Sequence, residues 1–175
     1  MVSDQSKQDF RQALSLLSAA VNVITTDGSH GRFGLTASAV CSVTDTPPTL
    51  LVCINRNSSI HEAVLGNKAL CVNILTGQLE GVARQFAGMT DLPPAKRFSD
   101  QDWRTGSSGL PVLNDALASL EGTIVDVKEV GSHSVLFVEI NHIQVREDGE
   151  SLIYFSRNFH RLGRVAAVDL ATSAS

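Results

Sequence analysis

The sequence predicts a mainly β protein, an antiparallel barrel of about seven strands with two or three short helices outside it. The chain has 175 residues, of which 43% are hydrophobic, and this length fits one domain that can bury a core without a metal or a disulfide. The second half carries short alternating apolar segments separated by turn residues, with no long helical pattern. A doubly wound parallel sheet needs helices between its strands throughout, so that class is disfavoured, whereas closing an antiparallel sheet removes its exposed edges.

The first half begins with an amphipathic helix, indicated by apolar residues at helical spacing, and continues with strands indicated by alternation. Turn residues between Asp27 and Gly31 join the first two strands into a hairpin, which ends at a pair of prolines. Ser59 and Glu62 have the spacing of a capping box, so a short helix should begin there. The expected elements are a helix over residues 5–19, strands over 21–25, 32–44 and 49–55, a helix from 59, a strand over 69–75 and a helix over 79–86.

The second half opens with a segment rich in Gly, Pro and Ser over residues 88–111, which we expect to form a long loop over a site or a subunit contact. Two short turns then separate three alternating segments, which predicts an antiparallel meander. Its strands are expected over residues 117–129, 133–146 and 151–157. The Ala-rich chain after Gly163 favours a short terminal helix. We therefore take residues 1–175 as one domain, with a core over about residues 10–162 and a C-terminal tail over 163–175.

Composition argues against several classes of function. Fourteen Lys and Arg against eighteen Asp and Glu give a net charge of −4, which argues against a general nucleic-acid binder. No apolar run reaches ~18 residues and the N-terminus lacks the basic start of a secretory signal, so we expect a cytoplasmic protein that does not span a membrane. The three cysteines lie in apolar runs, and Cys41, Cys53 and Cys71 are expected to be buried structural thiols in a reducing compartment.

Two segments have side chains suited to a ligand. Between Gly34 and Val40, small and hydroxylic side chains share one strand face, which leaves room for a planar ligand or else forms a solvated face. The turn from Asn55 to Ser59 carries Arg56 and two serines ahead of a helix. The first turn of a helix presents free N–H groups, so this turn suits either a phosphate or simple N-capping.

The histidines separate into two groups. His133 and His160 lie at strand ends beside Gly or Arg residues and are the better candidates for a functional role, whereas His30 and His61 are expected to be exposed and idle. No two histidines have the spacing of a zinc-binding helix, so we expect no metal site. A serine hydrolase is unsupported because the sequence contains no G-x-S-x-G motif.

Taken together and in order, several motifs resemble the short-chain flavin reductases of two-component monooxygenases. The likeness runs from Phe10 to His160 and includes Gly34-Leu35-Thr36-Ala37-Ser38, Phe86-Ala87-Gly88-Met89-Thr90 and Leu152-Ile153-Tyr154-Phe155. The resemblance implies an FMN-binding split β-barrel with Greek-key antiparallel strands, usually a homodimer, that oxidises NADH and reduces FAD or FMN. It also implies that the reduced flavin diffuses to a separate oxygenase, which in this family often serves the catabolism of aromatic compounds.

The resemblance assigns roles residue by residue. The flavin ring and ribityl chain would lie against Thr36, Ala37 and Ser38, with Cys53, Ile54 and Asn55 beside them. The flavin phosphate would meet Ser58 and Ser59, and the pocket would be closed by Phe86, Ala87 and Gly88. His133 matches a histidine that contacts the nicotinamide nucleotide, and a second nucleotide-contacting segment is matched by Tyr154, Arg157 and His160. Ser132 stands where many relatives carry Asp, which changes the local charge beside His133.

Alternatives remain open at the level of the residues. A non-catalytic flavin or haem carrier on a similar barrel would use the same strand faces. A pyridoxine-phosphate type oxidase would need a second phosphate site with a basic cluster, which the sequence does not show. The residues do not decide between FAD and FMN. The family likeness favours NADH over NADPH, although Arg157 and Arg161 could meet a 2′-phosphate.

Overall fold

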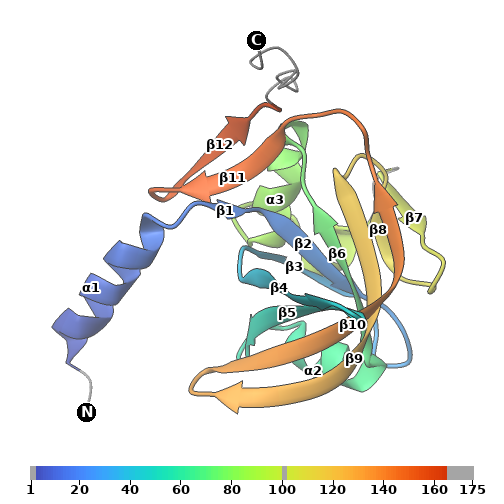
Figure 1. Ribbon diagram of the computed structural model, residues 1–175, viewed down its shortest axis with the longest axis horizontal. Coiled ribbons are helices and arrows are strands. Elements are labelled where there is room, and N and C mark those ends of the chain that lie inside the picture. The colour runs from blue at the N-terminus through green and yellow to red at the C-terminus, as the bar shows by residue number, and fades with distance from the viewer. Residues whose placement is uncertain (1–2, 100–101, 165–175) are drawn as a thin grey trace, which may run out of the picture.

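The computed structural model describes residues 3–99 and 102–164, and its main feature is a strongly curled antiparallel sheet (Figure 1). Seven strands pair in the order β3-β2-β6-β9-β10-β5-β4. Their bounds are β2 (Asn22–Thr26), β3 (Phe33–Ala37), β4 (Val40–Asp45), β5 (Pro48–Asn55), β6 (Ala69–Ile74), β9 (Ala118–Val130) and β10 (His133–Val145). The predicted class, mainly antiparallel β with a few short helices, is confirmed.

The longest pair, β9 and β10, explains the curl of the sheet. The two strands are joined by a tight turn in which Gly131 has a φ of +56°, a left-handed conformation that glycine adopts without strain. Their register shifts twice, between Phe137 and Val138 and again between Ile140 and His142. Each such bulge bends its strand and increases the local twist, so β9 and β10 wrap around the core instead of lying flat.

The core lies on the inner side of this sheet and continues under the helices. One cluster of buried aliphatic side chains, including Ile24, Val52 and Leu136, packs against α2 (His61–Asn67). A second cluster joins Val21 and Leu75 to α3 (Glu80–Phe86), which follows the short 3₁₀ helix η1 (Gly77–Leu79). The core is almost entirely aliphatic, as the low aromatic content requires.

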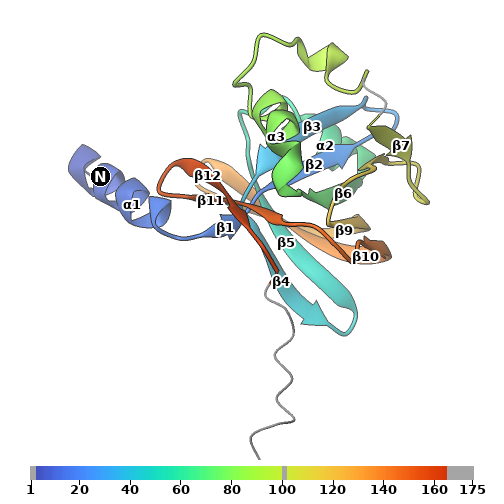
Figure 2. The same cartoon turned by 90° about the horizontal axis from the view of Figure 1, so that it is seen from above.

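A smaller three-stranded sheet, ordered β1-β11-β12, lies beside α3 (Figure 2). Its strands are β1 (Ala19–Ala20), β11 (Ser151–Phe155) and β12 (Asn158–Leu162). The helix α1 (Asp4–Ser15) precedes β1 and projects away from the body in both views. None of the α1 residues is buried. Its apolar face therefore packs into neither of the two core clusters that the described residues form.

The structure corrects several expected elements. The strand expected over 32–44 is two strands, because the chain leaves β3 at Ala37 and begins β4 at Val40, with the Val40 N–H donating to the Ser38 carbonyl at 2.9 Å. The expected loop over 88–111 contains the 3₁₀ helix η2 (Pro94–Lys96) and the strand β7 (Trp103–Thr105), which pairs with β8 (Pro111–Leu113). Alternation continues unbroken through residues 38 and 39, so periodicity alone did not reveal the break.

Two further expectations were wrong. The last expected strand does not extend the meander, since β11 pairs with β1 and β12 rather than with β10. The capping box at Ser59 is absent: α2 begins at His61, and its N-cap residue Ile60 makes no side-chain cap hydrogen bond. The terminal helix expected after Gly163 lies outside the described residues. Among the described residues, no helix is long and apolar enough to cross a membrane.

Candidate functional site

The site is built at the point where the two edges of the large sheet meet. Strands β3 and β4 are the edge strands, and only Ser38 and Ala39 separate them in the chain. The Ala39 carbonyl accepts a hydrogen bond from the Cys53 N–H at 3.0 Å, which fixes this corner against β5. A sheet edge carries unpaired backbone donors and acceptors. The small residues predicted to line a planar ligand therefore lie at a corner where such groups are available.

A cavity of about 220 Å³ opens on one side of this corner. Thr36, Ala37 and Ser38 line it together with Ala87 and Tyr154. The Thr36 hydroxyl donates to the Ala83 carbonyl at 2.7 Å, so this side chain ties β3 to α3 and its oxygen can only accept a hydrogen bond from a ligand. The cavity therefore brings Tyr154, which was assigned to the nucleotide, next to Thr36, Ala37, Ser38 and Ala87, which were assigned to the flavin.

A larger apolar trough of about 570 Å³ opens on the other side of the same corner. Ser38, Ala39, Cys41 and Cys53 line it, and Leu17 lies at its α1 side. Ser38 is thus shared by both hollows. Two flat groups placed in these hollows would approach each other at Ser38.

The turn after β5 lies beside the tip of the β9–β10 hairpin. Asn55 is paired with His133 in the register of β5 and β10, and the Arg56 N–H donates to the Ser132 carbonyl at 2.9 Å. An exposed ion pair at 2.6 Å between Arg56 and Glu129 joins the same two segments. The Ser132 hydroxyl lies 2.9 Å from His133 Nδ1, which leaves Nε2 as the ring nitrogen available to a ligand. The predicted phosphate turn and the predicted nicotinamide contact are therefore neighbours.

The second predicted nucleotide segment forms the β11–β12 hairpin. Tyr154 packs edge-on against Phe159 with ring centroids 5.1 Å apart. Arg157 donates through Nη2 to the Gln12 Oε1 of α1 at 2.9 Å, and His160 Nε2 lies 3.1 Å from the Phe155 carbonyl. Tyr154 faces the smaller cavity, whereas Arg157 and His160 lie at the end of the hairpin next to α1. His133 lies on β10 opposite Asn55, two residues along β5 from Cys53.

Several assigned residues have side chains that serve the fold or lie away from the corner at Ser38. Ile54 is 0% exposed and packs in the main core cluster. Phe86 is almost fully buried against Phe98 and Trp103. Ser58 donates its hydroxyl to the Asn55 carbonyl at 2.6 Å and so stabilises the turn. Ser59 lines a third cavity, of about 260 Å³.

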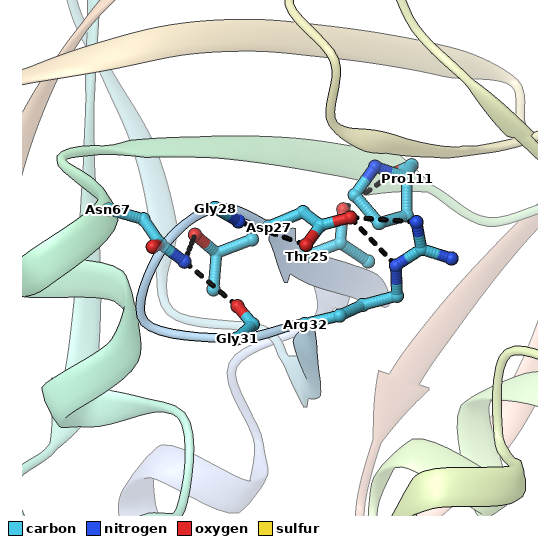
Figure 3. Close-up of polar contacts among 8 residues, drawn as sticks. Thr25, Asp27, Gly28, Gly31, Arg32, Asn67 and Pro111 are labelled. Carbon is cyan, nitrogen blue, oxygen red and sulfur yellow. Dashed lines mark hydrogen bonds and ion pairs between the residues drawn. The ribbon is translucent and has the colours of Figure 1, made fainter.

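Sequence reasoning missed the residues around this third cavity. Arg32 comes from the β2–β3 turn, and Arg97 and Phe98 come from the segment that was expected to be a loop. Figure 3 shows the ion pair between Arg32 and Asp27. Arg32 Nε and Nη2 lie 2.8 and 2.7 Å from the same oxygen, Asp27 Oδ2. Asn67 pins the same turn by donating to the Gly31 carbonyl at 2.9 Å. The sequence offered one signal for these residues, the low periodicity of residues 88–111. That signal predicts a segment that covers a site, but it does not single out Arg97.

Two expectations about individual side chains fail. Cys41 is exposed and Cys53 is half-buried, so only Cys71 is the buried thiol expected of all three. His61 is buried rather than exposed, and its Nε2 lies 2.9 Å from the Ser134 hydroxyl; α2 begins at His61, one residue later than the capping box implied. Within residues 3–99 and 102–164, no group of three or more potential metal ligands occurs.

The fold and the site define a small-molecule-binding protein on a split antiparallel sheet, with two hollows that share one corner residue. The chain belongs to the family described as "Flavin reductase like domain", whose profile matches residues 14–163. It is 59% identical over 156 residues to the 4-hydroxyphenylacetate 3-monooxygenase reductase component of Pseudomonas aeruginosa, which covers 89% of this chain and 92% of that relative.

Two other relatives extend the comparison. The FMN reductase (NADH) RutF of Pantoea ananatis is 45% identical over 161 residues, covering 92% of this chain and 84% of its own length. The Streptomyces globisporus NADH:FAD oxidoreductase SgcE6, solved in complex with NAD and FAD fragments, has a TM-score of 0.82 and 26% identity. The match covers 95% of this chain and 97% of that one. The suspected family is therefore confirmed.

Proposed function

We propose that this protein is an NADH-dependent flavin reductase that reduces FAD or FMN and releases the reduced flavin to a separate oxygenase. The observation that carries the proposal is the pair of hollows that meet at Ser38. A flavin reductase must hold two flat rings face to face, and small side chains at 37 to 39 leave space for both. The names of the relatives, a monooxygenase reductase component and an NADH-dependent FMN reductase, support the same activity.

The residues fit a flavin and a nicotinamide nucleotide. Both cofactors carry the redox chemistry: when bound, NADH supplies a hydride and the flavin accepts it together with a proton. The protein needs no nucleophile for this reaction, and its contribution is orientation. Ala37 and Ser38 keep the corner clear, and Cys53 and Ala39 offer an apolar wall to the trough.

The predicted site residues take positioning roles in this proposal. The Ser38 hydroxyl and the main chain of Ile54 and Asn55 would orient the flavin. Ser58 and Ser59 would face its phosphate, and Ala87 and Gly88 would close the smaller cavity. His133 would hold the nicotinamide nucleotide through Nε2, and Tyr154, Arg157 and His160 would form the second nucleotide contact. NADPH remains the less favoured nucleotide.

The partner in the proposal is a flavin-dependent oxygenase, reached by diffusion of reduced flavin. The relative in Pseudomonas aeruginosa is named as the reductase component of 4-hydroxyphenylacetate 3-monooxygenase, which favours that oxygenase and a role in aromatic catabolism. We place the protein in the cytoplasm, since NADH and an exposed thiol at Cys41 both belong to a reducing compartment.

The proposal includes a homodimer. Phe10 on α1 is 64% exposed, Leu14 lies on the same helical face, and Leu17, two residues after the helix ends, is 66% exposed. This face and the apolar trough form a contiguous unpartnered surface at Leu17, and surfaces of this kind mark protein contacts. A second copy covering the trough would exclude water from the flavin and complete the binding site.

Rapid mixing tests the activity directly. Mixing the protein with NADH and oxidised FAD, FMN or riboflavin in anaerobic buffer should remove the absorbance of the oxidised flavin. Failure to bleach any of the three flavins would reject a reductase. A protein that purifies with a tightly held flavin or haem but oxidises no NADH would instead be a carrier.

A further inference from the structure

His61 is a buried polar side chain that the proposed reaction does not use. It is the first residue of α2 and is 9% exposed, and its Nε2 lies 2.9 Å from the hydroxyl of Ser134, which is 0% exposed. A buried hydrogen-bonded pair contributes little net stability over an apolar pair of the same shape, because both polar groups must first leave water. The pair therefore calls for a role other than stability.

The Ser134 end of this bond lies next to the residue assigned to the nicotinamide nucleotide. On β10, His133 is paired with Asn55 of β5, and Ser134 is paired with the buried Ile54. Successive side chains of a strand point to opposite faces, so Ser134 faces the core while the exposed His133 faces outward. The bond from His61 thus reaches β10 from the inner side, one residue away from the proposed nucleotide contact.

The other end of the bond belongs to the turn that carries the proposed phosphate contacts. The Asn55 carbonyl accepts from the Ser58 N–H at 3.0 Å and from the Ser58 hydroxyl at 2.6 Å. The Ser58 carbonyl in turn accepts from the His61 N–H at 3.1 Å. His61 therefore holds the downstream end of the turn through its main chain, and its ring fastens that end to β10.

The turn is thus fastened to the β9–β10 hairpin at both of its ends. The upstream end is held by the ladder between β5 and β10 and by the Arg56 N–H, which donates to the Ser132 carbonyl at 2.9 Å. The downstream end is held by the bond between His61 and Ser134. Ile60 also packs in the main core cluster, but apolar packing is not directional and fixes the turn less closely than a hydrogen bond.

We propose that His61 is a positioning residue for the flavin phosphate. Its hydrogen bond to Ser134 holds Ser58 and Ser59 in place relative to β10, and so relative to His133. This inference rests on the proposed function, because it takes the two serines to meet the phosphate. His61 itself is buried and acts through the turn. Its loss should therefore affect flavins that carry a phosphate, whereas riboflavin, which has none, should bind as before.

Calorimetric titration of oxidised FMN and riboflavin tests the role. His61→Leu replaces the imidazole with an apolar side chain of similar volume. We expect it to weaken FMN binding about tenfold, the loss expected for one charge-assisted hydrogen bond, and to change riboflavin binding less than about twofold. With riboflavin as the acceptor, kcat and the KM for NADH should stay within about twofold, because the strand ladder still holds His133. His61→Gln, whose amide can bond to the Ser134 hydroxyl, should restore most of the FMN affinity.

Two further variants keep the test independent of the folding of His61→Leu. Ser134→Ala removes the other partner of the bond and should show the same selective loss of FMN affinity. The double variant should bind FMN no more weakly than either single variant, because all three lack the same bond. Thr25→Val is the control, since it removes a buried hydroxyl that donates to the Pro111 carbonyl at 2.6 Å, away from the turn. It should lower stability and leave both flavin affinities unchanged.

Several results would overturn the positioning role. Equal losses of FMN and riboflavin affinity would show a general structural role, and full FMN affinity in Ser134→Ala would show that the bond does not hold the phosphate turn. A raised KM for NADH with riboflavin would assign the bond to the nucleotide half of the site. A wild-type protein that binds FMN no more tightly than riboflavin would also contradict the role. All of these leave flavin reduction intact, whereas a wild-type protein that oxidises no NADH with any flavin would reject the proposed function itself.

Discussion

Ala37 occupies the position where the size of one side chain matters most for the proposed activity. It lines the cavity of about 220 Å³ beside Ser38, and a Trp side chain there would fill the space that the proposed flavin ring needs. We expect Ala37→Trp to weaken flavin binding about a hundredfold, which corresponds to roughly 2.7 kcal/mol. Titration of the oxidised flavins measures this loss. Val145→Trp, on an exposed part of β10, is the matched control, and retained flavin affinity in Ala37→Trp would contradict the placement.

His133 tests the nucleotide half of the site. Its side chain is exposed, and Ser132 occupies the Nδ1 side of the ring. Removing one hydrogen bond to the nucleotide should raise the KM for NADH about tenfold in His133→Ala, with the KM for flavin unchanged within about twofold. Steady-state kinetics with each substrate varied in turn measure the two values. His142→Ala, an exposed histidine further along β10, should change neither, and equal shifts of both constants in His133→Ala would reject the assigned role.

Cys71 makes the stability of the fold depend on pH. Burial raises the pKa of this thiol from 9.0 to about 12, with a smaller contribution from the Glu121 carboxylate. The folded state therefore keeps the proton that the unfolded chain releases above pH 9, so this stabilisation is complete below pH 9 and is lost as the pH rises toward 12. Between pH 8 and 10.5 the free energy of unfolding should fall by about 2 kcal/mol from this group alone.

Urea unfolding at the two pH values measures that change. Other groups titrate in the same range, so the informative quantity is the difference between variants. Cys71→Ala should lose the part of the slope that comes from the thiol, whereas Cys41→Ala, which removes an exposed thiol, should keep it. Identical slopes in Cys71→Ala and the wild type would show that the buried thiol does not control this range.

At the scale of elements, the turn between β11 and β12 is strained. Ser156 and Arg157 have φ values of 49° and 62°, the left-handed conformation at both central positions of the hairpin, where Asn and Gly are strongly favoured. Ser156→Asn keeps Arg157 and its contact with Gln12 while relieving part of the strain. We expect the free energy of unfolding to rise by about 0.5–1 kcal/mol, measured by urea denaturation. Ser29→Asn, in the exposed β2–β3 turn, is the control, and a loss of stability in Ser156→Asn would contradict the expectation.

The elements also show how much the sequence could predict. β9 and β10 were predictable because long alternation flanks a turn with glycine at its centre. β7, with three residues, is too short for a periodic pattern to separate it from a loop. The pairing of β11 with β1 depends on which surface the chain covers after β10 and has no local signal. The corner residues Thr36 to Ser38 stand out by their small size, whereas Arg97 reaches its cavity only through packing between distant segments.

At the scale of the whole molecule, the net charge of −4 opposes the binding of the proposed cofactors. Both proposed cofactors are anions, so the protein as a whole repels them, and their phosphates must be met locally. Arg32 and Arg97 line one cavity with Ser59, and Arg56 lies in the turn before Ser59, where it pairs with Glu129, so positive charge gathers near this turn. A net negative charge with a few local arginines suits a flavin that must bind, react and leave.

The proposed dimer makes the last prediction. α1 is a twelve-residue helix with an exposed apolar face and no buried residue, so a charge on that face should not disturb the core of the monomer. Phe10→Glu should convert the dimer into a folded monomer, because burying a carboxylate in an apolar contact is costly. Light scattering after gel filtration measures the mass, and circular dichroism measures the fold. Gln8→Glu adds the same charge to the opposite face of α1 and should remain a dimer.

The same variant connects assembly to the site. Leu17 lines the trough beside Cys41 and Cys53, so loss of the partner would open the trough to water. If the second copy completes the flavin site, monomeric Phe10→Glu should bind flavin at least about tenfold more weakly than Gln8→Glu, since apolar contacts to the ring are replaced by solvent. A monomeric Phe10→Glu with full flavin affinity would show that each chain carries a complete site. A wild-type protein that is monomeric at micromolar concentration would reject the dimer itself.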